Sequence, residues 1–223
     1  MGEGWQLLSI RGIPLRIHPS WFVILALATV AFQQQYSQQL SSAGTAAELW
    51  ALGLLTALLL FVSVLLHELG HSLVALRQGV QVRSITLFLL GGVASVEREC
   101  PTAMGSLLVA AAGPLVSLLL ALALLSAGHS VSHASPLLGA MVNELGGLNL
   151  ILALFNLLPG LPLDGGLILK ALVWQFTGSQ RKGIQVATAS GRFLSLLAIG
   201  LGVVLLLRGA SRERKRPLAV ATW

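Results

Sequence analysis

The sequence predicts an all-α polytopic membrane protein of about six transmembrane segments, with a small N-terminal strand and a β-hairpin forming a sheet at the cytoplasmic interface. Of the 223 residues, 55% are hydrophobic and only 10% are charged, whereas a soluble domain carries about 25% charged residues. The mean hydropathy is +0.84, and long apolar stretches recur along the chain. Lipid is therefore expected to surround most of the protein.

The net charge of +6 does not indicate nucleic-acid binding. Four of the 14 basic residues lie in the segment RERKR (212–216), and no aromatic residues are interspersed among them. A basic segment after a hydrophobic helix is typical of a cytoplasmic anchor against anionic lipid. We therefore expect one membrane domain over residues 1–208, followed by a basic cytoplasmic tail over 209–223 or the beginning of a further C-terminal domain.

The first elements are a short strand and two membrane spans. The apolar residues of 13–17 (IPLRI) alternate with Pro14 and Arg16, which is the period of a strand. Spans are expected over 19–36 and 47–77, and the second exceeds the about 20 residues that a helix needs to cross the hydrocarbon core.

A β-hairpin is expected over residues 82–98 (VRSITLFLLGGVASVER). Two short β-prone runs flank Gly91 and Gly92, a pair typical of a two-residue hairpin turn. Because an open sheet edge is not tolerated facing lipid, the hairpin must lie at the interface or be covered by helices.

The second half of the chain predicts further spans over 103–127, 144–159 and 184–208, and a polar loop over 128–143. The helix expected over 166–177 is too short to cross alone at about 1.5 Å per residue.

Basic residues predict the orientation, because cytoplasmic loops are enriched in Lys and Arg. One side of the membrane receives the C-terminal tail and five arginines: Arg11, Arg16, Arg77, Arg83 and Arg98. Arg181 and Lys182 fall on the other side if all the segments cross. Either the short fifth segment does not cross fully, or this loop departs from the rule.

Ionisable residues inside an apolar segment are the strongest functional signal, because charge is costly at membrane depth. The segment HELGH (67–71) matches H-E-x-x-H. On a helix, His67 and His71 share one face and can bind the same metal ion. Glu68 is rotated by about 100° from His67 and can approach the open position of the metal. The alternative, a pair of helix-packing histidines, would bury these groups without compensation.

A catalytic zinc ion takes three protein ligands and a water molecule, so a third ligand is needed. The candidates are His18, His129, His133, Glu144 and Asp164. His129 and His133 are interpreted as solvated loop histidines on the opposite side, His18 as interfacial, and Glu144 as an acidic residue opening a helix. Asp164 is the only aspartate, and it lies on the same side as His71 in a stretch broken by Pro and Gly.

Three motifs carry a resemblance to a known family. HELGH, NLLPGLPLDGG (156–166) and, more weakly, AAGPLVS (111–117) resemble the motifs of the site-2 proteases, intramembrane zinc metalloproteases of peptidase family M50, in the prokaryotic form without a PDZ domain. The resemblance implies that His67, His71 and Asp164 bind one Zn²⁺ per chain and that Glu68 is the general base.

The resemblance also suggests a substrate-binding region and two departures from the family pattern. Asn156 would hold the scissile carbonyl or the substrate strand, and Pro159, Gly91 and Gly92 are placed with the substrate-binding or oxyanion residues. Leu167 replaces an arginine that the family often has. Ser117 replaces the commoner asparagine of AAGPLVS, so we expect the polar role of this element to be weakened.

The function implied by the resemblance is hydrolysis of a peptide bond within a locally unwound transmembrane segment. The substrate would be a single-span protein such as an anti-sigma factor or a membrane-bound regulator. The expected location is the prokaryotic plasma membrane, with the active site toward the cytoplasm and no nucleic-acid partner. The alternatives are a zinc transporter or metal-sensing membrane protein and a catalytically inactive scaffold that binds membrane helices.

Overall fold

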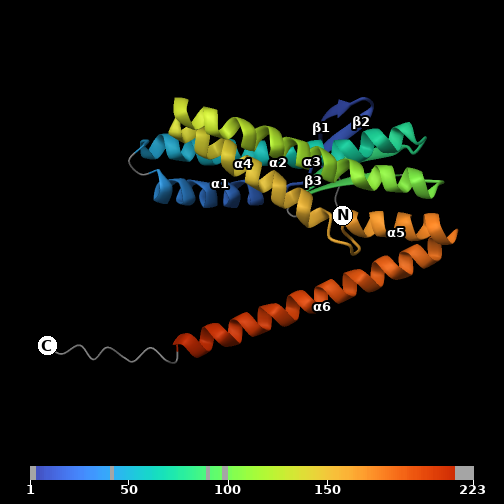
Figure 1. Ribbon diagram of the computed structural model, residues 1–223. Helices are drawn as coiled ribbons and strands as arrows, with labels where there is room; N and C mark the ends of the chain where they lie inside the picture. Colours follow the sequence, from blue (N-terminus) through green and yellow to red (C-terminus); the bar gives the residue numbers. More distant parts are fainter. Residues whose placement is uncertain (1–3, 41–42, 89–90, 97–99, 214–223) are drawn as a thin grey trace.

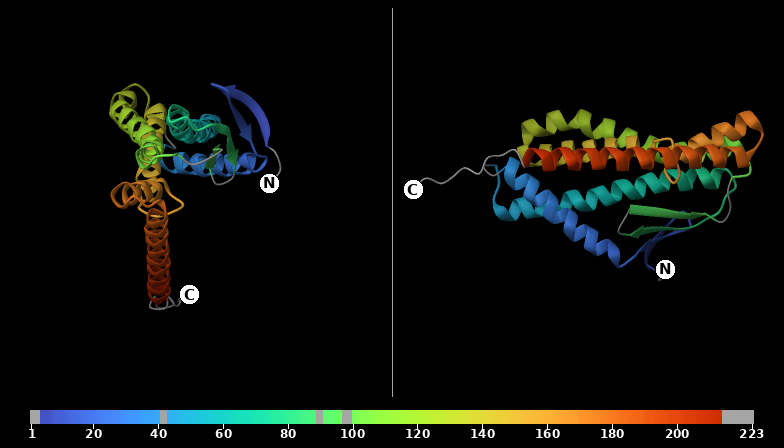
Figure 2. Two further views of the ribbon diagram at one scale, coloured as in Figure 1. Left: turned by 90° about the vertical axis from the view of Figure 1, so that its right-hand side faces the viewer. Right: turned by 90° about the horizontal axis from the view of Figure 1, so that it is seen from below.

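The computed structural model describes residues 4–40, 43–88, 91–96 and 100–213. Helices α1 to α4 lie side by side, with a small sheet on one flank and α5 at one end (Figure 1). Helix α6 extends away from this bundle, and its apolar stretch is almost entirely exposed (Figure 2). In chain order the elements are β1 (Trp5–Ile10), β2 (Ile13–Ile17), α1 (Ser20–Gln39), α2 (Ala46–Arg77), β3 (Val82–Phe88), β4 (Gly91–Val96), α3 (Ala103–Ala134), α4 (Pro136–Asn156), α5 (Asp164–Thr177) and α6 (Gln180–Glu213).

Among the helices of the described residues, four are long and apolar enough to cross a membrane: α2, α3, α4 and α6. Helix α1 ends in the polar sequence QQQYSQQ (33–39), and α5 has only 14 residues. All six predicted helices are therefore present, but six membrane crossings are not confirmed. A short α5 that does not span the membrane also fits the position of Arg181 and Lys182. The chain is a mostly helical integral membrane protein.

The predicted loop over residues 128–143 is wrong. Helix α3 continues to Ala134, and α4 begins at Pro136 after the single residue Ser135. The Ser135 hydroxyl accepts the backbone N–H of Leu138, and Pro136 occupies the first turn, where its missing N–H costs nothing. One capping residue is enough to separate the two helices, so the polar residues of this region lie on helices.

The sheet contains four strands in the order β1-β2-β3-β4, with β2 and β3 parallel and the outer pairs antiparallel. The predicted N-terminal strand is thus half of a hairpin, which turns at Arg11 and Gly12 with positive φ angles of 50° and 85°. The predicted turn at Gly91 and Gly92 is wrong, because both residues pair with β3 inside β4. Residues 89–90, which join the two strands, lie outside the described residues.

The buried face of the sheet packs against α1 and α2. The alternation predicted for residues 13–17 is confirmed, since Ile13, Leu15 and Ile17 are buried. They join a core cluster with Trp21 of α1 and Phe61 of α2, whose rings meet edge to face at 5.1 Å. This packing fixes the sheet beside the helix that carries HELGH.

Candidate metal centre

Two glycines allow the HELGH segment to approach α3 closely. A Cβ on Gly70 would lie 3.0 Å from the Ala112 carbonyl oxygen. The backbones of α2 and α3 can therefore approach this closely only because Gly70 has no side chain. A Cβ on Gly113 would lie 2.7 Å from His67 Nε2 and would also collide with the ring of His71. Gly113 therefore leaves on α3 the space that both imidazoles occupy.

Asp164 is positioned by a loop that folds back on the start of α5. The chain leaves α4 at Asn156, and the Leu163 N–H donates to the Gly160 carbonyl at 2.9 Å. Gly165 and Gly166 are buried, and a Cβ on either would collide with the backbone of this loop. The D-G-G sequence thus permits a tight return that directs the Asp164 side chain toward α2.

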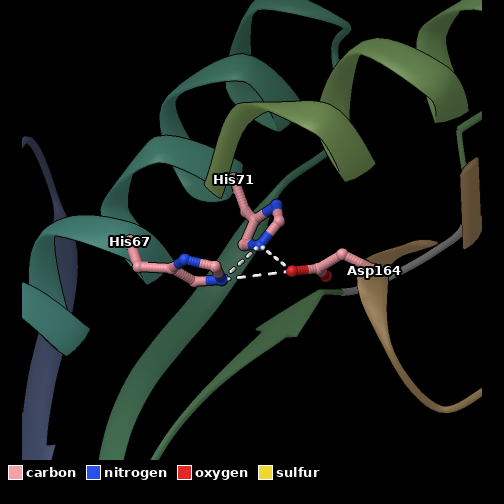
Figure 3. A group of neighbouring side chains, drawn as sticks. All are labelled: His67, His71 and Asp164. Carbon is pink, nitrogen blue, oxygen red and sulfur yellow. Dashed lines mark hydrogen bonds and ion pairs between the residues drawn. The ribbon is translucent and has the colours of Figure 1, made fainter. Parts of the chain in front are cut away.

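The structure brings together the three residues singled out as metal ligands (Figure 3). Asp164 Oδ2 lies 3.1 Å from His67 Nε2 and 3.3 Å from His71 Nε2, and the two Nε2 atoms are 3.2 Å apart. The side chains of His67, His71 and Asp164 are only 5%, 13% and 14% exposed. Residues separated by 97 positions in sequence therefore converge on one small, largely buried volume.

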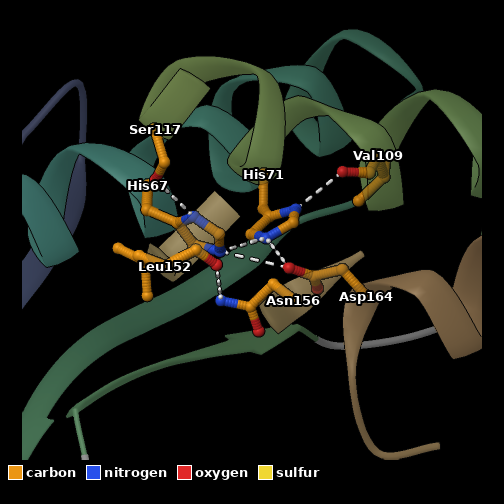
Figure 4. A network of polar contacts seen from close by, with 7 residues as sticks. All are labelled: His67, His71, Val109, Ser117, Leu152, Asn156 and Asp164. Atoms are coloured by element: carbon orange, nitrogen blue, oxygen red, sulfur yellow. Dashed lines mark hydrogen bonds and ion pairs between the residues drawn. The ribbon is translucent and has the colours of Figure 1, made fainter. Parts of the chain in front are cut away.

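Hydrogen bonds orient both imidazoles. His71 Nδ1 donates to the Val109 carbonyl oxygen at 2.7 Å, and His67 Nδ1 lies 2.9 Å from the Ser117 hydroxyl (Figure 4). When Nδ1 carries the proton, Nε2 presents its lone pair to a cation. Both Nε2 atoms point toward Asp164.

The structure assigns Ser117 a role that sequence reasoning missed. The substitution of the usual asparagine was expected to weaken this element, yet the Ser117 side chain is fully buried and contacts His67 directly. The signal that could have revealed it is the spacing of Gly113 and Ser117, which share one face of α3. Gly113 leaves room for both imidazole rings, and Ser117 contacts the ring of His67.

The donor set fits zinc. Two imidazole nitrogens and one carboxylate oxygen are the ligands of many catalytic zinc sites, which keep a fourth position open. An ionised carboxylate is the form that binds a cation.

The residues expected to support catalysis have different surroundings. Glu68 is partly buried, and a Cβ on Gly92 of β4 would lie 2.8 Å from its Cγ, so β4 packs against the proposed base. Asn156 lies beside the ligands in Figure 4, and its amide nitrogen donates to the Leu152 carbonyl at 3.0 Å. Pro159 is exposed, and its carbonyl accepts the Ser190 hydroxyl of α6, which connects this residue to α6.

The other candidate ligands are elsewhere. His18 contacts Ser20 at 2.8 Å, and Glu144 accepts the Gln35 amide at 2.8 Å between α1 and α4. Within the described residues, His67, His71 and Asp164 form the one group of three metal-binding side chains with converging ligand atoms.

Comparison with known proteins places this chain in a family of metallopeptidases. The sequence model of peptidase family M50 matches residues 55–137 and 129–199. The sll0528 protein of Synechocystis sp., whose name assigns it to the zinc metalloproteases, is 53% identical over 91% of the chain and 52% of its own length. Rip3 of Mycobacterium tuberculosis, named in the same way, is 39% identical over 94% of the chain and 53% of its own length.

The structural comparison agrees with the sequence comparison. The site-2 protease from Methanocaldococcus jannaschii has a TM-score of 0.58 and 32% identity, covering 91% of this chain and 86% of that one. The chain belongs to peptidase family M50, the site-2 protease family. It spans about half the length of the curated relatives it matches.

Proposed function

We propose that this chain is the membrane-embedded catalytic domain of a zinc-dependent endopeptidase that cleaves transmembrane segments. The observation that carries the proposal is the convergence of His67, His71 and Asp164 within a bundle whose helices are apolar enough to span a membrane. One Zn²⁺ per chain would bind these three residues and keep a position for water.

The chain supplies the groups that a hydrolytic reaction needs around such an ion. When bound, zinc acidifies a water molecule and polarises a carbonyl group. Glu68 accepts the proton of the attacking water and transfers it to the amine that leaves as the peptide C–N bond breaks. Glu68 follows a metal ligand on the same helical turn, so the backbone fixes its position relative to the centre.

The sheet gives an unwound substrate a place to bind. A helical segment hides its amide groups in its own hydrogen bonds, so it must unwind before attack. Strand β4 is at the edge of the sheet, and its Gly92 packs against Glu68. An extended substrate segment that pairs with this edge would pass directly beside the base. Asn156, close to the ligands in Figure 4, would contact the scissile carbonyl or the substrate strand.

The location and partners follow from the same features. Helix α2 ends at Arg77, about two turns beyond His71, and Arg83 lies on the adjacent β3. By the positive-inside rule, these arginines support an active site toward the cytoplasm, and the membrane proposed is a prokaryotic plasma membrane. The substrate is a single-span membrane protein, such as an anti-sigma factor or another membrane-bound regulator. Residues 1–208 form the protease domain, although α6 itself continues to Glu213. The tail proposed beyond it lies mostly outside the described residues.

Two substitutions separate catalysis from metal binding. Glu68→Gln is expected to retain zinc and to lose cleavage of a single-span model substrate by a factor of about 10² to 10⁴ or more. His67→Ala is expected to lose both zinc and cleavage. Full activity of Glu68→Gln would contradict the role of Glu68. Zinc uptake into proteoliposomes without cleavage would instead favour a transporter.

A further inference from the structure

A second pair of histidines repeats the geometry of the HELGH pair. His129 and His133 lie one turn apart near the end of α3, and their Nε2 atoms are 3.3 Å apart. The corresponding Nε2 atoms of His67 and His71 are 3.2 Å apart. The distance between the ring centroids and the angle between the ring planes are also similar. They are 4.7 Å and 86° for the α3 pair and 4.8 Å and 78° for the α2 pair.

The surroundings of the two pairs differ. Both rings of the α3 pair are exposed and lie in the polar run GHSVSH (128–133) at the end of the helix, so an ion can reach them and water can fill the other coordination positions. Among the described residues no third histidine, cysteine or carboxylate converges on them. Two imidazoles with water suit Zn²⁺, Cu²⁺ or Ni²⁺, whereas Mg²⁺ and Ca²⁺ prefer oxygen ligands.

Helix α3 packs closely against α4 at the turns that carry this pair. Asn143 of α4 contacts the Ser132 hydroxyl at 3.4 Å, and Gly128 and Gly139 allow close packing, because a Cβ on either would collide with the facing helix. A well-packed helix holds two residues four positions apart on one face, so only their side chains remain to be ordered when a metal binds. The backbone beneath the pair is therefore preorganised for chelation.

This pair lies far from the catalytic centre. It is 12 residues beyond Ser117 on α3, which corresponds to about 18 Å along a helix. Helix α3 runs from the end of the bundle near α5 to the opposite end (Figure 1). An ion bound there cannot share ligands with His67, His71 or Asp164.

We infer that His129 and His133 form a second metal site that takes an exchangeable divalent transition-metal ion at the end of the bundle opposite the catalytic centre. The two-histidine chelate holds the last turn of α3 in its helical form directly before the α3–α4 junction. The site responds to the free metal concentration on its own side of the membrane, because two protein ligands and open solvent permit rapid exchange.

The test is the number of zinc ions bound by the full chain, purified without a polyhistidine tag and dialysed to equilibrium against Zn²⁺. The wild-type protein is expected to bind about two ions, and His129→Ala or His133→Ala about one, with cleavage of a model substrate unchanged. His71→Ala is expected to lose the catalytic ion and keep the second one, so failure of this inference is distinguishable from failure of the proposed function.

A matched control keeps the number of histidines and changes only their geometry. Val131→His combined with His133→Ala places the second ring about 200° around the helix from His129, so the chelate is lost and about one ion should remain bound. In a His71→Ala background, which removes the buried two-imidazole site, the nitrogen splitting in the electron paramagnetic resonance spectrum of added Cu²⁺ should report two imidazoles for the His129–His133 pair and a single imidazole for the control variant. A wild-type protein that binds a single ion at saturation, or a control variant that binds the second ion equally well, would overturn the inference.

Discussion

The two histidine pairs of this protein have the same spacing and almost the same Nε2 separation, 3.2 Å on α2 and 3.3 Å on α3, but only one has the surroundings of a resident metal centre. The rings on α2 are largely buried, each Nδ1 has a hydrogen-bond partner, and Asp164 completes the set. The rings on α3 are exposed, with no third ligand among the described residues.

The difference shows what the H-x-x-x-H spacing contributes and what it does not. Helical geometry alone brings two imidazoles within chelating distance. The third ligand, the hydrogen bonds to Nδ1 and the exclusion of water come from other elements, and these decide affinity and chemistry. Substitutions at Gly113, Ser117 and Tyr36 test this division.

Gly113→Ala should abolish zinc binding at the buried pair. The added Cβ would occupy the space of both imidazoles, so the rings could not keep their positions. Zinc content and cleavage should fall at least a hundredfold, while the α3 pair still binds its ion. Gly147→Ala on α4 is the control, because no atom of another described element lies within 4 Å of its added Cβ. Normal zinc affinity in Gly113→Ala would show that the rings have room that the structure does not show.

Ser117→Ala should lower zinc affinity by about 10-fold to 100-fold, because loss of a hydrogen-bond partner to a ligating histidine has this effect. The change leaves His67 Nδ1 without the hydroxyl that it contacts. Competition with a zinc chelator provides the measurement. Ser126→Ala on the same helix is the matched control, since its hydroxyl donates to the Ala123 carbonyl oxygen of its own helix. Equal affinities for the two variants would exclude Ser117 as an orienting residue.

Tyr36→Phe should have the smallest effect and should leave both metal sites unchanged. The buried Tyr36 hydroxyl lies 3.0 Å from Thr56 Oγ1 between α1 and α2, and loss of one such hydrogen bond costs about 1 kcal/mol. The free energy of unfolding in detergent should fall by this amount with zinc content unchanged. A change in zinc affinity would reveal coupling between the two ends of the bundle.

The sequence predicted which three residues converge because each is chemically conspicuous. His67, His71 and the only aspartate lie in apolar segments, where an ionisable residue is costly and is usually retained for a function. The role of Ser117 was missed because a serine in a membrane helix is unremarkable until its partner is known. The sequence predicts all six helices of the fold. The prediction of a loop over 128–143 is wrong, because the exposed face of a helix and a loop are both rich in polar residues.

The errors in the sheet have a common physical cause. Gly91 and Gly92 were assigned to a turn because glycine pairs are typical of hairpins, but Gly92 is needed where β4 passes over Glu68. Such a requirement depends on contacts between elements distant in sequence, as does the parallel pairing of Leu15 with Ile85. Local patterns cannot reveal either feature.

The most direct test of the account is the zinc content of Asp164→Ala, measured in a His129→Ala background so that only the catalytic centre is counted. Glu144→Ala in the same background is the control, because that carboxylate contacts Gln35 at 2.8 Å, away from the ligands. Asp164→Ala is expected to lose its zinc and its cleavage activity, whereas Glu144→Ala is expected to keep its zinc. A full zinc complement in Asp164→Ala would contradict the convergence of these three residues on one ion.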